Sequence, residues 1–416
     1  MKNKFETIAI HTGNSPDPVT GSISPSIHLT STFVQDGIGK NKGYDYSRGG
    51  NPTRARLEKN IAALEGGFDA IAFASGMAAT TALFQGLQKG DHVIVSRNVY
   101  GGTYRMATQI LKHHGLDFDF VDTRDSKNIE NNINPNTKWV FIETPTNPML
   151  EITEIQEVSK ICKEHGIKLA VDNTFMSSFG QRPLEFGADC VMHSSTKFIG
   201  GHGNSIGGVV TESGRFNWGN GRFPEMTEPV ATYNGLRYWE NFGEYAFCTK
   251  LRSEQLRDLG ASLAPMNAFL LIQGLETLPF RMDGHVANAK TVASFLQSHS
   301  EVSWVNYAGL ESSPHYELAN KYMPKGPGAI FTFGVKGGRE AGAKFIDSLQ
   351  LISHLANVGD VRSLVIHPAS TTHQQLSDED LASGGVSADM VRLSVGLEDS
   401  DDILWDLDQA LEKASS

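Results

Sequence analysis

One lysine, Lys197, lies in a stretch whose residue types could do chemistry: MHSSTKFIGGHGNSIGG, residues 192–208. Small hydroxyl residues precede this lysine, glycines follow it, and the stretch holds two histidines, His193 and His202. Such a pattern suits four functions: a phosphate-binding loop, a dinucleotide-binding motif, a metal site, or a lysine that forms a covalent bond. A tight turn beside an ordinary surface lysine is the alternative without a function.

The order and spacing of these residues disfavour the first three functions. A P-loop places its glycines before the lysine, whereas here they follow it. Gly201, Gly203 and Gly207 have nearly the dinucleotide-motif spacing, but that motif opens a helix and IGGVV is strand-like. His193 and His202 have no supporting ligands on a helix face, so we predict no metal site. A Schiff-base lysine remains, condensed with the aldehyde of pyridoxal 5′-phosphate (PLP).

PLP needs a carboxylate for its ring nitrogen, a stacking group and a phosphate cup. Asp172 ends the apolar run IKLAVD and could keep the ring nitrogen protonated. Tyr100 follows DHVIVSRNV and could stack on the ring. Singly, these could be a capping aspartate and a core tyrosine; together at strand ends they favour the cofactor. The predicted phosphate ligands, helix N-terminal amides and hydroxyls beside the lysine, are Gly76, Met77, Ser194 and Thr196.

The elements around these residues alternate short apolar runs with helical patterns. Strands joined by crossover helices predict an α/β fold with a mostly parallel sheet. In such sheets, functional groups gather on loops at the carboxyl ends of the strands. The strands predicted for this sheet lie at 69–75, 91–96, 138–145, 167–175, 189–195 and 206–212.

The two ends of the chain differ from this alternating region. Residues 1–52 lack a sustained period and are predicted to form an arm. The α/β domain is predicted over 53–255, with helices that include 100–115 and a surface loop near 217–229 followed by a long helical region. Residues 256–416 are predicted to form a smaller α+β domain, which begins near the change of pattern after Pro265.

Composition limits the classes of function. The chain has 416 residues, 36 Lys and Arg against 47 Asp and Glu, and a net charge of −11, which disfavours nucleic-acid binding. No apolar run is long enough for a membrane span, and the N-terminus lacks a signal-peptide pattern, so we expect a cytoplasmic protein. Its three distant cysteines suit a reducing compartment.

Eight motifs, in order, resemble the PLP-dependent enzymes of cysteine and methionine metabolism. The resemblance runs over nearly the whole chain, and its most specific motif surrounds the lysine. It implies fold type I, the aspartate-aminotransferase-like architecture with a mostly parallel central sheet and a smaller C-terminal α+β domain, and it implies that Lys197 carries PLP. The motifs are YSRGGNPT, ASGMAA, YGGTY, ETPTNP, VDNTF, HSSTKFIGGHG, SLVIHPAS and VRLSVGLE.

The resemblance also implies roles for residues that spacing alone does not single out. Tyr46 and Arg48 of the arm would reach the phosphate in a neighbouring subunit, which implies a homo-oligomer, expected to be a dimer of dimers. Asn147 and Thr174 would lie near the ring oxygen of PLP.

An amino-acid substrate would be held at the C-terminal domain. In VRLSVGLE, Val391 and Leu393 share one face of the strand and Arg392 points to the other. The Arg392 guanidinium matches a carboxylate in a bidentate manner, and the resemblance implies that Ser363 assists it. The resemblance further implies that the substrates are small molecules, an amino acid and a thiol.

Within the family, the segments near 229–252 and 353–376 most resemble O-acetylhomoserine sulfhydrylases. The implied reaction replaces the acetate of O-acetylhomoserine by sulfide or methanethiol, giving homocysteine or methionine. Cystathionine γ-synthase and O-succinylhomoserine sulfhydrylase are the alternatives. Methionine γ-lyases carry a cysteine beside the active-site tyrosine, where this chain has Gly102, so a lyase is less expected.

Overall fold

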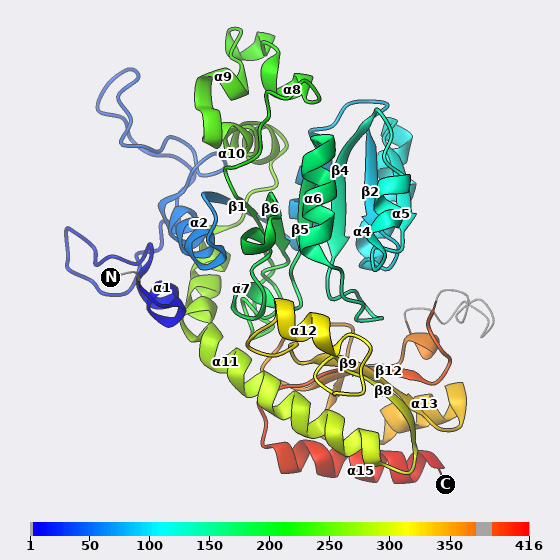
Figure 1. Ribbon diagram of the computed structural model, residues 1–416. Helices are drawn as coiled ribbons and strands as arrows, with labels where there is room; N and C mark the ends of the chain where they lie inside the picture. Colours follow the sequence, from blue (N-terminus) through cyan, green and yellow to red (C-terminus); the bar gives the residue numbers. More distant parts are fainter. Residues whose placement is uncertain (1–2, 372–384, 416) are drawn as a thin grey trace.

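The computed structural model describes residues 3–371 and 385–415, which fold around two β-sheets (Figure 1). The larger sheet has seven strands in the order β1-β7-β6-β5-β4-β2-β3. Six of them coincide with the predicted apolar runs; β3, an edge strand with exposed aspartates, was not predicted. The strands are β1 (Asp69–Phe73), β2 (His92–Ser96), β3 (Asp117–Val121), β4 (Thr137–Glu143), β5 (Lys168–Asp172), β6 (Cys190–His193) and β7 (Gly208–Glu212).

The strand directions bring the carboxyl ends of six strands to one edge of this sheet. Strands β3, β2, β4, β5 and β6 are parallel neighbours. β7 is antiparallel to both β6 and β1, so β1 runs in the same direction as β6. The predicted mostly parallel sheet is confirmed, and the loops after β1, β2, β4, β5 and β6 all emerge at the same edge.

Helices cover both faces of the seven-stranded sheet, because its side chains alternate between two apolar cores. On β4, Val140 and Ile142 belong to the core that includes α6, whereas Trp139 and Phe141 belong to the core that includes α3 and α10. The helices of this part are α2 (Pro52–Glu65), α3 (Gly76–Gln85), α4 (Gly101–Arg105), α5 (Ser126–Asn131), α6 (Ile155–His165), α7 (Ser177–Gly180), α8 (Pro224–Thr227), α9 (Tyr238–Phe242) and α10 (Ala246–Lys250).

Two predicted helical stretches are broken in the structure. The region predicted at 100–115 is the short α4 followed by a π-helical turn, Met106–Ile110, and a 3-10 turn, Leu111–His114. The long helical region after the loop consists of α9, α10 and a π-helical segment, Leu251–Asp258. Periodicity identified the helical character of both stretches but not their interruptions.

A five-stranded sheet, in the order β10-β11-β12-β9-β8, forms the smaller part of the molecule. It lies within 256–416, and the larger sheet lies within 53–255, whereas the domain boundaries themselves stay a prediction. The strands are β8 (Val302–Asn306), β9 (Ile330–Val335), β10 (Ser353–His354), β11 (Leu364–Ile366) and β12 (Met390–Ser394). The helices are α11 (Pro265–Ser298), α12 (Tyr316–Tyr322), α13 (Gly338–Ser348) and α15 (Ser400–Ser415).

Helix α11, of 34 residues, connects the two parts and contacts α2 at one end and β8 and α15 toward the other (Figure 1). It was not predicted. Gly274, Pro279 and Gly284 interrupt its sequence, and local rules treat such residues as helix ends. Burial of one long face, including Leu271, Leu278 and Met282, keeps it continuous.

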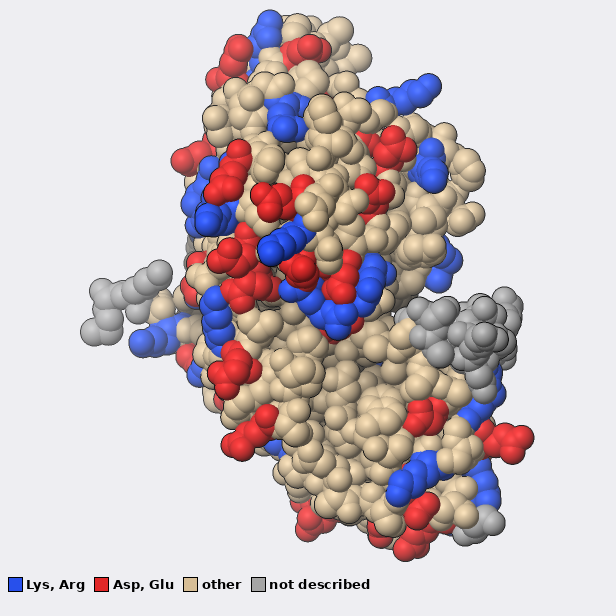
Figure 2. All heavy atoms as spheres, turned by 45° about the vertical axis from the view of Figure 1, so that its right-hand side comes forward, with Lys and Arg blue, Asp and Glu red and all other residues tan. Residues whose placement is uncertain are grey.

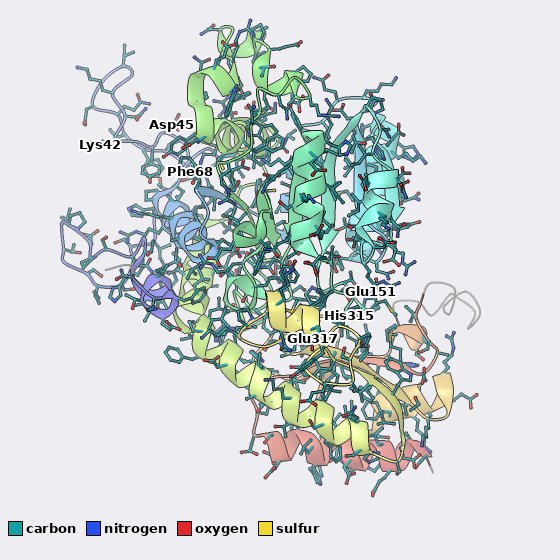
Figure 3. All side chains as sticks on the ribbon, viewed as in Figure 1. Lys42, Asp45, Phe68, Glu151, His315 and Glu317 are labelled. Atoms are coloured by element: carbon teal, nitrogen blue, oxygen red, sulfur yellow. The ribbon has the colours of Figure 1, made fainter. Side chains whose placement is uncertain are left out.

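The N-terminal residues form one short helix and projecting loops. Helix α1 (Phe5–His11) places Ala9 in the core and was not predicted. Beyond it, the chain loops away from the body at the left of Figure 1, and Figure 3 shows Lys42 and Asp45 on one of these loops. The loops expose several apolar side chains, namely Val19, Ile23, Leu29, Val34 and Ile38.

Charged side chains of both signs are interspersed on the face shown in Figure 2. Some are paired: Arg97 and Arg124 lie 3.1 and 2.6 Å from the carboxylate of Asp122. In Figure 3, Glu151 and His315 lie where the two parts of the molecule meet. Among the described residues, no helix is both long enough and apolar enough to cross a membrane.

Candidate active site

A cavity of about 280 Å³ opens at the edge of the large sheet where the carboxyl ends of its parallel strands emerge. Its lining includes residues from the large sheet and from the loop before β11, so both parts of the molecule build it. Most of the residues singled out from the sequence meet here: Gly76, Met77, Tyr100, Asn147, Asp172, Thr174, Ser194, Thr196, Lys197 and Arg392. Three others, Tyr46, Arg48 and Ser363, are not in the lining.

Lys197 follows β6 and extends its amine into this cavity. Its Nζ donates a hydrogen bond to Asn357 Oδ1 at 2.5 Å. Burial, with a smaller effect of the positive charge on Arg392, lowers the pKa of Lys197 from 10.5 to about 8. An amine with this pKa is neutral, and therefore nucleophilic, far more often at neutral pH than an ordinary lysine. This environment suits condensation with an aldehyde.

Asp172, the last residue of β5, presents a buried carboxylate to the same cavity. Its Oδ1 accepts hydrogen bonds from Thr174 N at 3.0 Å and from Thr174 Oγ1 at 2.5 Å. Burial raises the pKa of Asp172 despite these bonds. A cationic N–H beside this carboxylate would offset the cost of its burial, and the protonated pyridine nitrogen of PLP is such a group. The site therefore fits the ring of the cofactor.

Glu143, the last residue of β4, was not predicted from the sequence. It pairs in register with Asp172 and is buried beside it. Its carboxylate accepts from Tyr100 N at 2.7 Å and from Asn147 N at 2.8 Å. Burial, and the negative charge of Asp172, raise the pKa of Glu143 well above its ordinary value. Glu143 thus holds two predicted cofactor ligands in place, and its position at a strand end was the available signal.

The N-terminus of α3 lies against the residues before Lys197, at the place where the phosphate of PLP is predicted to bind. Ser75 caps α3 by accepting from Ala78 N at 3.1 Å, and the first amides of the helix have no partner within it. A Cβ on Gly76 would lie 2.7 Å from Ser194 Cβ, so glycine permits this close approach. The Thr196 hydroxyl is already bonded to Gly207, donating to its carbonyl and accepting from its amide.

Tyr100 and Arg392 border the cavity from opposite parts of the molecule. Tyr100 leads into α4 and is 48% exposed, so its ring is accessible for stacking. Arg392 points from β12 into the cavity, and its neighbours Val391 and Leu393 lie in the core. Burial lowers the pKa of Arg392 to about 10.

Asn147 and Asn357 hold the Arg392 guanidinium. Nη1 donates to Asn147 Oδ1 at 2.9 Å and Nη2 donates to the Asn357 carbonyl at 3.4 Å. Asn357 therefore contacts both cationic side chains of the cavity, since its Oδ1 accepts from Lys197. Sequence reasoning missed Asn357, because it lies in an irregular loop where neither periodicity nor a strand end marks it.

The structure does not bring three predicted site residues into the lining. The Ser363 hydroxyl is buried, donates to Glu398 Oε2 at 2.9 Å and accepts from Gly396 N at 2.9 Å. Tyr46 and Arg48 lie on the arm, where Arg48 Nε donates to the Arg257 carbonyl at 2.6 Å. The roles assigned to these three residues stay predictions.

The histidines beside Lys197 have other partners. His193 Nε2 lies 2.5 Å from Glu65 Oε1, and His202 Nδ1 lies 2.7 Å from the Gly200 carbonyl. In the part of the chain that the structure describes, no group of three or more His, Cys, Asp or Glu residues is arranged to hold a metal ion.

Comparison with known proteins gives a consistent result over the whole chain. The model of the family "Cys/Met metabolism PLP-dependent enzyme" matches residues 6–412. O-acetyl-L-homoserine sulfhydrylase of Leptospira meyeri is 47% identical over 98% of this chain and 97% of its own length. Homocysteine synthase of Schizosaccharomyces pombe is 44% identical over 99% and 98%, respectively.

A solved structure is similar to this chain in both fold and sequence. Cystathionine gamma-lyase from Lactobacillus plantarum, crystallised with L-serine, superimposes with a TM-score of 0.86 at 38% identity, over 99% of this chain and 100% of that one. The predicted fold type I is thereby confirmed, as is the prediction of PLP as cofactor. The chain belongs to the PLP-dependent enzymes of cysteine and methionine metabolism.

Proposed function

We propose that this chain is an O-acetyl-L-homoserine sulfhydrylase of methionine biosynthesis. It replaces the acetoxy group of O-acetyl-L-homoserine by sulfide, which yields L-homocysteine and acetate; with methanethiol the product is L-methionine. The observation that carries the proposal is the meeting of Lys197, Asp172 and Arg392 around one cavity. Relatives with 44–47% identity over nearly their whole length bear the names of this activity.

Arg392 binds the α-carboxylate of the amino acid through its planar guanidinium, and Ser363, the residue that precedes β11, supports this binding indirectly. Within the described part of the lining, Lys197 and Arg392 are the cationic side chains. A succinyl group would bring a second carboxylate that needs another cation, whereas an acetyl group needs none. This difference favours O-acetylhomoserine over O-succinylhomoserine.

PLP, when bound, supplies an electron sink for the charge that develops at the substrate Cα. Asp172 keeps the proton on the pyridine nitrogen, and Tyr100 stacks on the ring. With PLP bound, Lys197 Nζ would be the base that removes the substrate Cα proton, and its lowered pKa suits it to this role. Loss of a second proton, from Cβ, lets acetate leave from Cγ; the thiol, which gives up its proton to solvent, adds at Cγ, one proton returns to Cβ, and Lys197 returns the other to Cα.

Phosphate binding falls to Gly76, Met77, Ser194 and Thr196, and Asn147 and Thr174 lie near the ring oxygen. Tyr46 and Arg48 act on the phosphate of a neighbouring subunit, so the active unit is at least a dimer and the assembly a dimer of dimers. The exposed apolar side chains of the arm support such an assembly. We place the enzyme in the cytoplasm.

Cystathionine γ-synthase and methionine γ-lyase are the rival activities. A Cβ on Gly102 would lie 2.4 Å from Tyr100 Cε1 and 3.0 Å from Met77 Sδ. A cysteine at this position would therefore displace the Tyr100 ring from where it lies. This crowding adds to the sequence argument against the lyase.

Product analysis tests the proposal. The purified protein is given O-acetylhomoserine with sulfide, O-succinylhomoserine with cysteine, or methionine alone, and its visible spectrum is recorded. We expect homocysteine and acetate in equal amounts from the first mixture, at a higher kcat/KM than the other reactions. Faster formation of cystathionine, or of 2-oxobutyrate and ammonia from methionine, would assign a rival activity; absence of visible absorption would contradict PLP chemistry altogether.

A further inference from the structure

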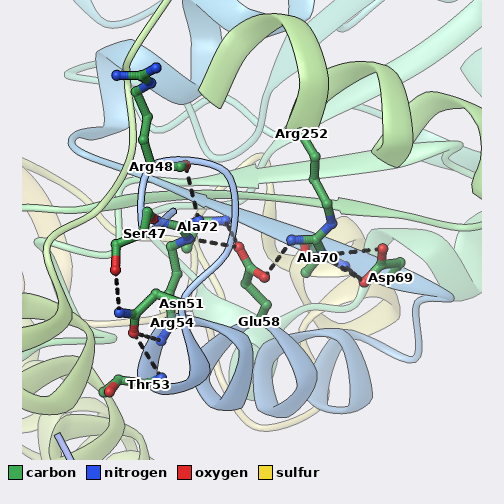
Figure 4. A network of polar contacts seen from close by, with 10 residues as sticks. All are labelled: Ser47, Arg48, Asn51, Thr53, Arg54, Glu58, Asp69, Ala70, Ala72 and Arg252. Carbon is green, nitrogen blue, oxygen red and sulfur yellow. Dashed lines mark hydrogen bonds and ion pairs between the residues drawn. The ribbon is translucent and has the colours of Figure 1, made fainter. Parts of the chain in front are cut away.

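A buried arginine of α2, Arg54, binds the backbone of the arm at the residues assigned to a neighbouring subunit. Its Nη1 donates to the Ser47 carbonyl at 2.9 Å and its Nη2 donates to the Arg48 carbonyl at 3.2 Å. The Arg54 side chain is almost completely buried. One guanidinium thus fixes two successive peptide groups of the YSR motif (Figure 4).

An ion network holds the Arg54 guanidinium in turn. Arg54 Nε lies 3.6 Å from Glu58 Oε1, which also accepts from Ala72 N at 2.9 Å. Glu58 Oε2 lies 2.7 Å from Arg252 Nη1, and Arg252 Nη2 reaches Asp69 at 3.3 Å. The arm backbone is therefore linked through Arg54 and Glu58 to β1, the strand that leads into the phosphate cup.

The same arm residues send their side chains outward. Tyr46 and Arg48 are exposed, and Figure 4 shows the Arg48 side chain directed away from the network that holds its carbonyl. Asn51 provides a second anchor, since its Nδ2 donates to Ser47 Oγ at 3.0 Å. Arg48 Nε also donates to the Arg257 carbonyl at 2.6 Å, within its own chain. A fixed backbone with exposed side chains is the arrangement that a residue acting on another molecule requires.

We infer that Arg54 is a positioning residue for the phosphate site of the neighbouring subunit: it orders the 46–48 segment so that Tyr46 and Arg48 are presented to that subunit's PLP. The inference rests on the proposed function, which has these two side chains act across the interface. The two Nη groups of one planar guanidinium donate to the Ser47 and Arg48 carbonyls. A lysine amine lacks this fixed geometry, so lysine cannot replace Arg54 fully. Arg54 serves its own subunit's site only through the network to β1.

The first test compares PLP affinity among single variants of the oligomeric enzyme. Arg54→Met should weaken PLP binding about tenfold or more, with Arg54→Lys intermediate, because the Ser47 and Arg48 carbonyls lose their donor. Arg56→Met is the matched control: two residues along the same helix, Arg56 Nη1 donates to the arm carbonyls of Gly13 and Ser15, both at 3.1 Å. It should bind PLP as the wild type does.

The second test separates action across the interface from a role in folding. Arg54→Met chains are co-expressed with Lys197→Ala chains under different tags, and oligomers that contain both are purified. Where an Arg54→Met chain pairs with a Lys197→Ala chain, the first supplies a site with an intact lysine. The second supplies the arm that reaches this site, and in that arm Arg54 is intact. The mixed oligomers should therefore contain a class of tight PLP sites, seen by visible absorption during titration, that neither variant has alone. If Arg54→Met does not assemble, Arg54→Lys takes its place.

The outcomes are distinct. Tight sites in the mixed oligomers support the inference, whereas their absence, or wild-type PLP affinity in the Arg54 variants, overturns it. Failure of the wild type to bind PLP or to form homocysteine would instead refute the proposed function. An effect of Arg56→Met equal to that of Arg54→Met would also overturn the inference, because general loosening of the arm would then explain both.

Discussion

The amine of Lys197 is unusual at the scale of a single residue, because its surroundings make the neutral form accessible. Burial and the charge of Arg392 both disfavour the ammonium form, so the pKa of Lys197 falls to about 8. Condensation with an aldehyde requires the neutral amine. The cofactor-free protein should therefore react with PLP at a rate that depends on this pKa.

The rate of reconstitution with PLP should rise with pH around a midpoint of about 8 and level off above it. Stopped-flow absorption of the cofactor-free protein measures this profile. In Arg392→Ala the midpoint should move upward, because a positive charge that disfavours the ammonium form is removed. A rate that keeps rising toward the ordinary lysine value of 10.5 in the wild type would contradict the assigned environment.

Arg392→Ala should also separate substrate binding from cofactor binding. Loss of a charge-assisted contact to the α-carboxylate should raise the KM for O-acetylhomoserine about 10- to 100-fold. The visible absorption should persist, since the guanidinium bonds Asn147 and Asn357 rather than the phosphate cup. Loss of PLP from this variant would show that the arginine serves the cofactor.

The sequence identified about half of the residues that line the cavity, because strand-end positions and motif types mark those residues. It missed Glu143 and Asn357 for different reasons. Glu143 acts through backbone amides that only the folded chain brings to it, and Asn357 lies in a loop without a period. The sequence also placed Ser363 among the substrate ligands, whereas in the structure the Ser363 hydroxyl donates a hydrogen bond to Glu398.

At the scale of elements, the junction of β1, α3 and the segment after β6 decides whether a phosphate can be held. β1 reaches the functional edge because β7 reverses direction between β6 and β1. Helix α3 then starts at Gly76, packed against Ser194. A larger residue at this contact must push the two halves of the cup apart.

Gly76→Ala should lower PLP affinity about tenfold, because the added Cβ would lie 2.7 Å from Ser194 Cβ. Equilibrium titration of the cofactor-free variant measures the change. Gly86→Ala is the matched control at the other end of α3, where a Cβ would meet Lys250 Cε at an ordinary 3.6 Å. Equal affinities in the two variants would contradict the close-packed cup.

Element prediction succeeded where burial creates a local pattern and failed where distant packing overrides one. Six of the seven strands of the central sheet are short, largely apolar runs, so their sequence indicates them, whereas β3, with Asp117 and Asp119 exposed, was missed. Helix α11 contains Pro279 and two glycines, and only its long buried face keeps it continuous. The π-helical segment Leu251–Asp258 likewise has no signature in the pattern of apolar residues.

At the scale of the whole molecule, contacts within a single chain do not explain the exposed apolar surface of the arm. Its loops expose apolar side chains, and Ile38 and Val34 are essentially uncovered. Its YSR segment is nevertheless held firmly by Arg54. Such an uncovered apolar surface is what the proposed oligomer predicts, because there a second copy of the chain would cover the arm.

Substituting Ile23 and Val34 together by serine should weaken assembly, raising the dissociation constant of the oligomer about tenfold or more. Sedimentation velocity across a concentration series measures this constant. Trp405→Ser, at an exposed apolar site on α15, is the control and should leave assembly unchanged. A wild-type chain that sediments as a monomer at all concentrations would refute the role of the arm.

The most direct test of the whole account is to locate the covalent bond between protein and cofactor. The holoenzyme is reduced with borohydride, which converts a lysine–aldehyde imine into a stable secondary amine, then digested and analysed by mass spectrometry. We expect a phosphopyridoxyl group on the peptide that contains Lys197. In Lys197→Ala, both this label and turnover should be lost. Label on a different lysine, or an active Lys197→Ala enzyme, would contradict the account.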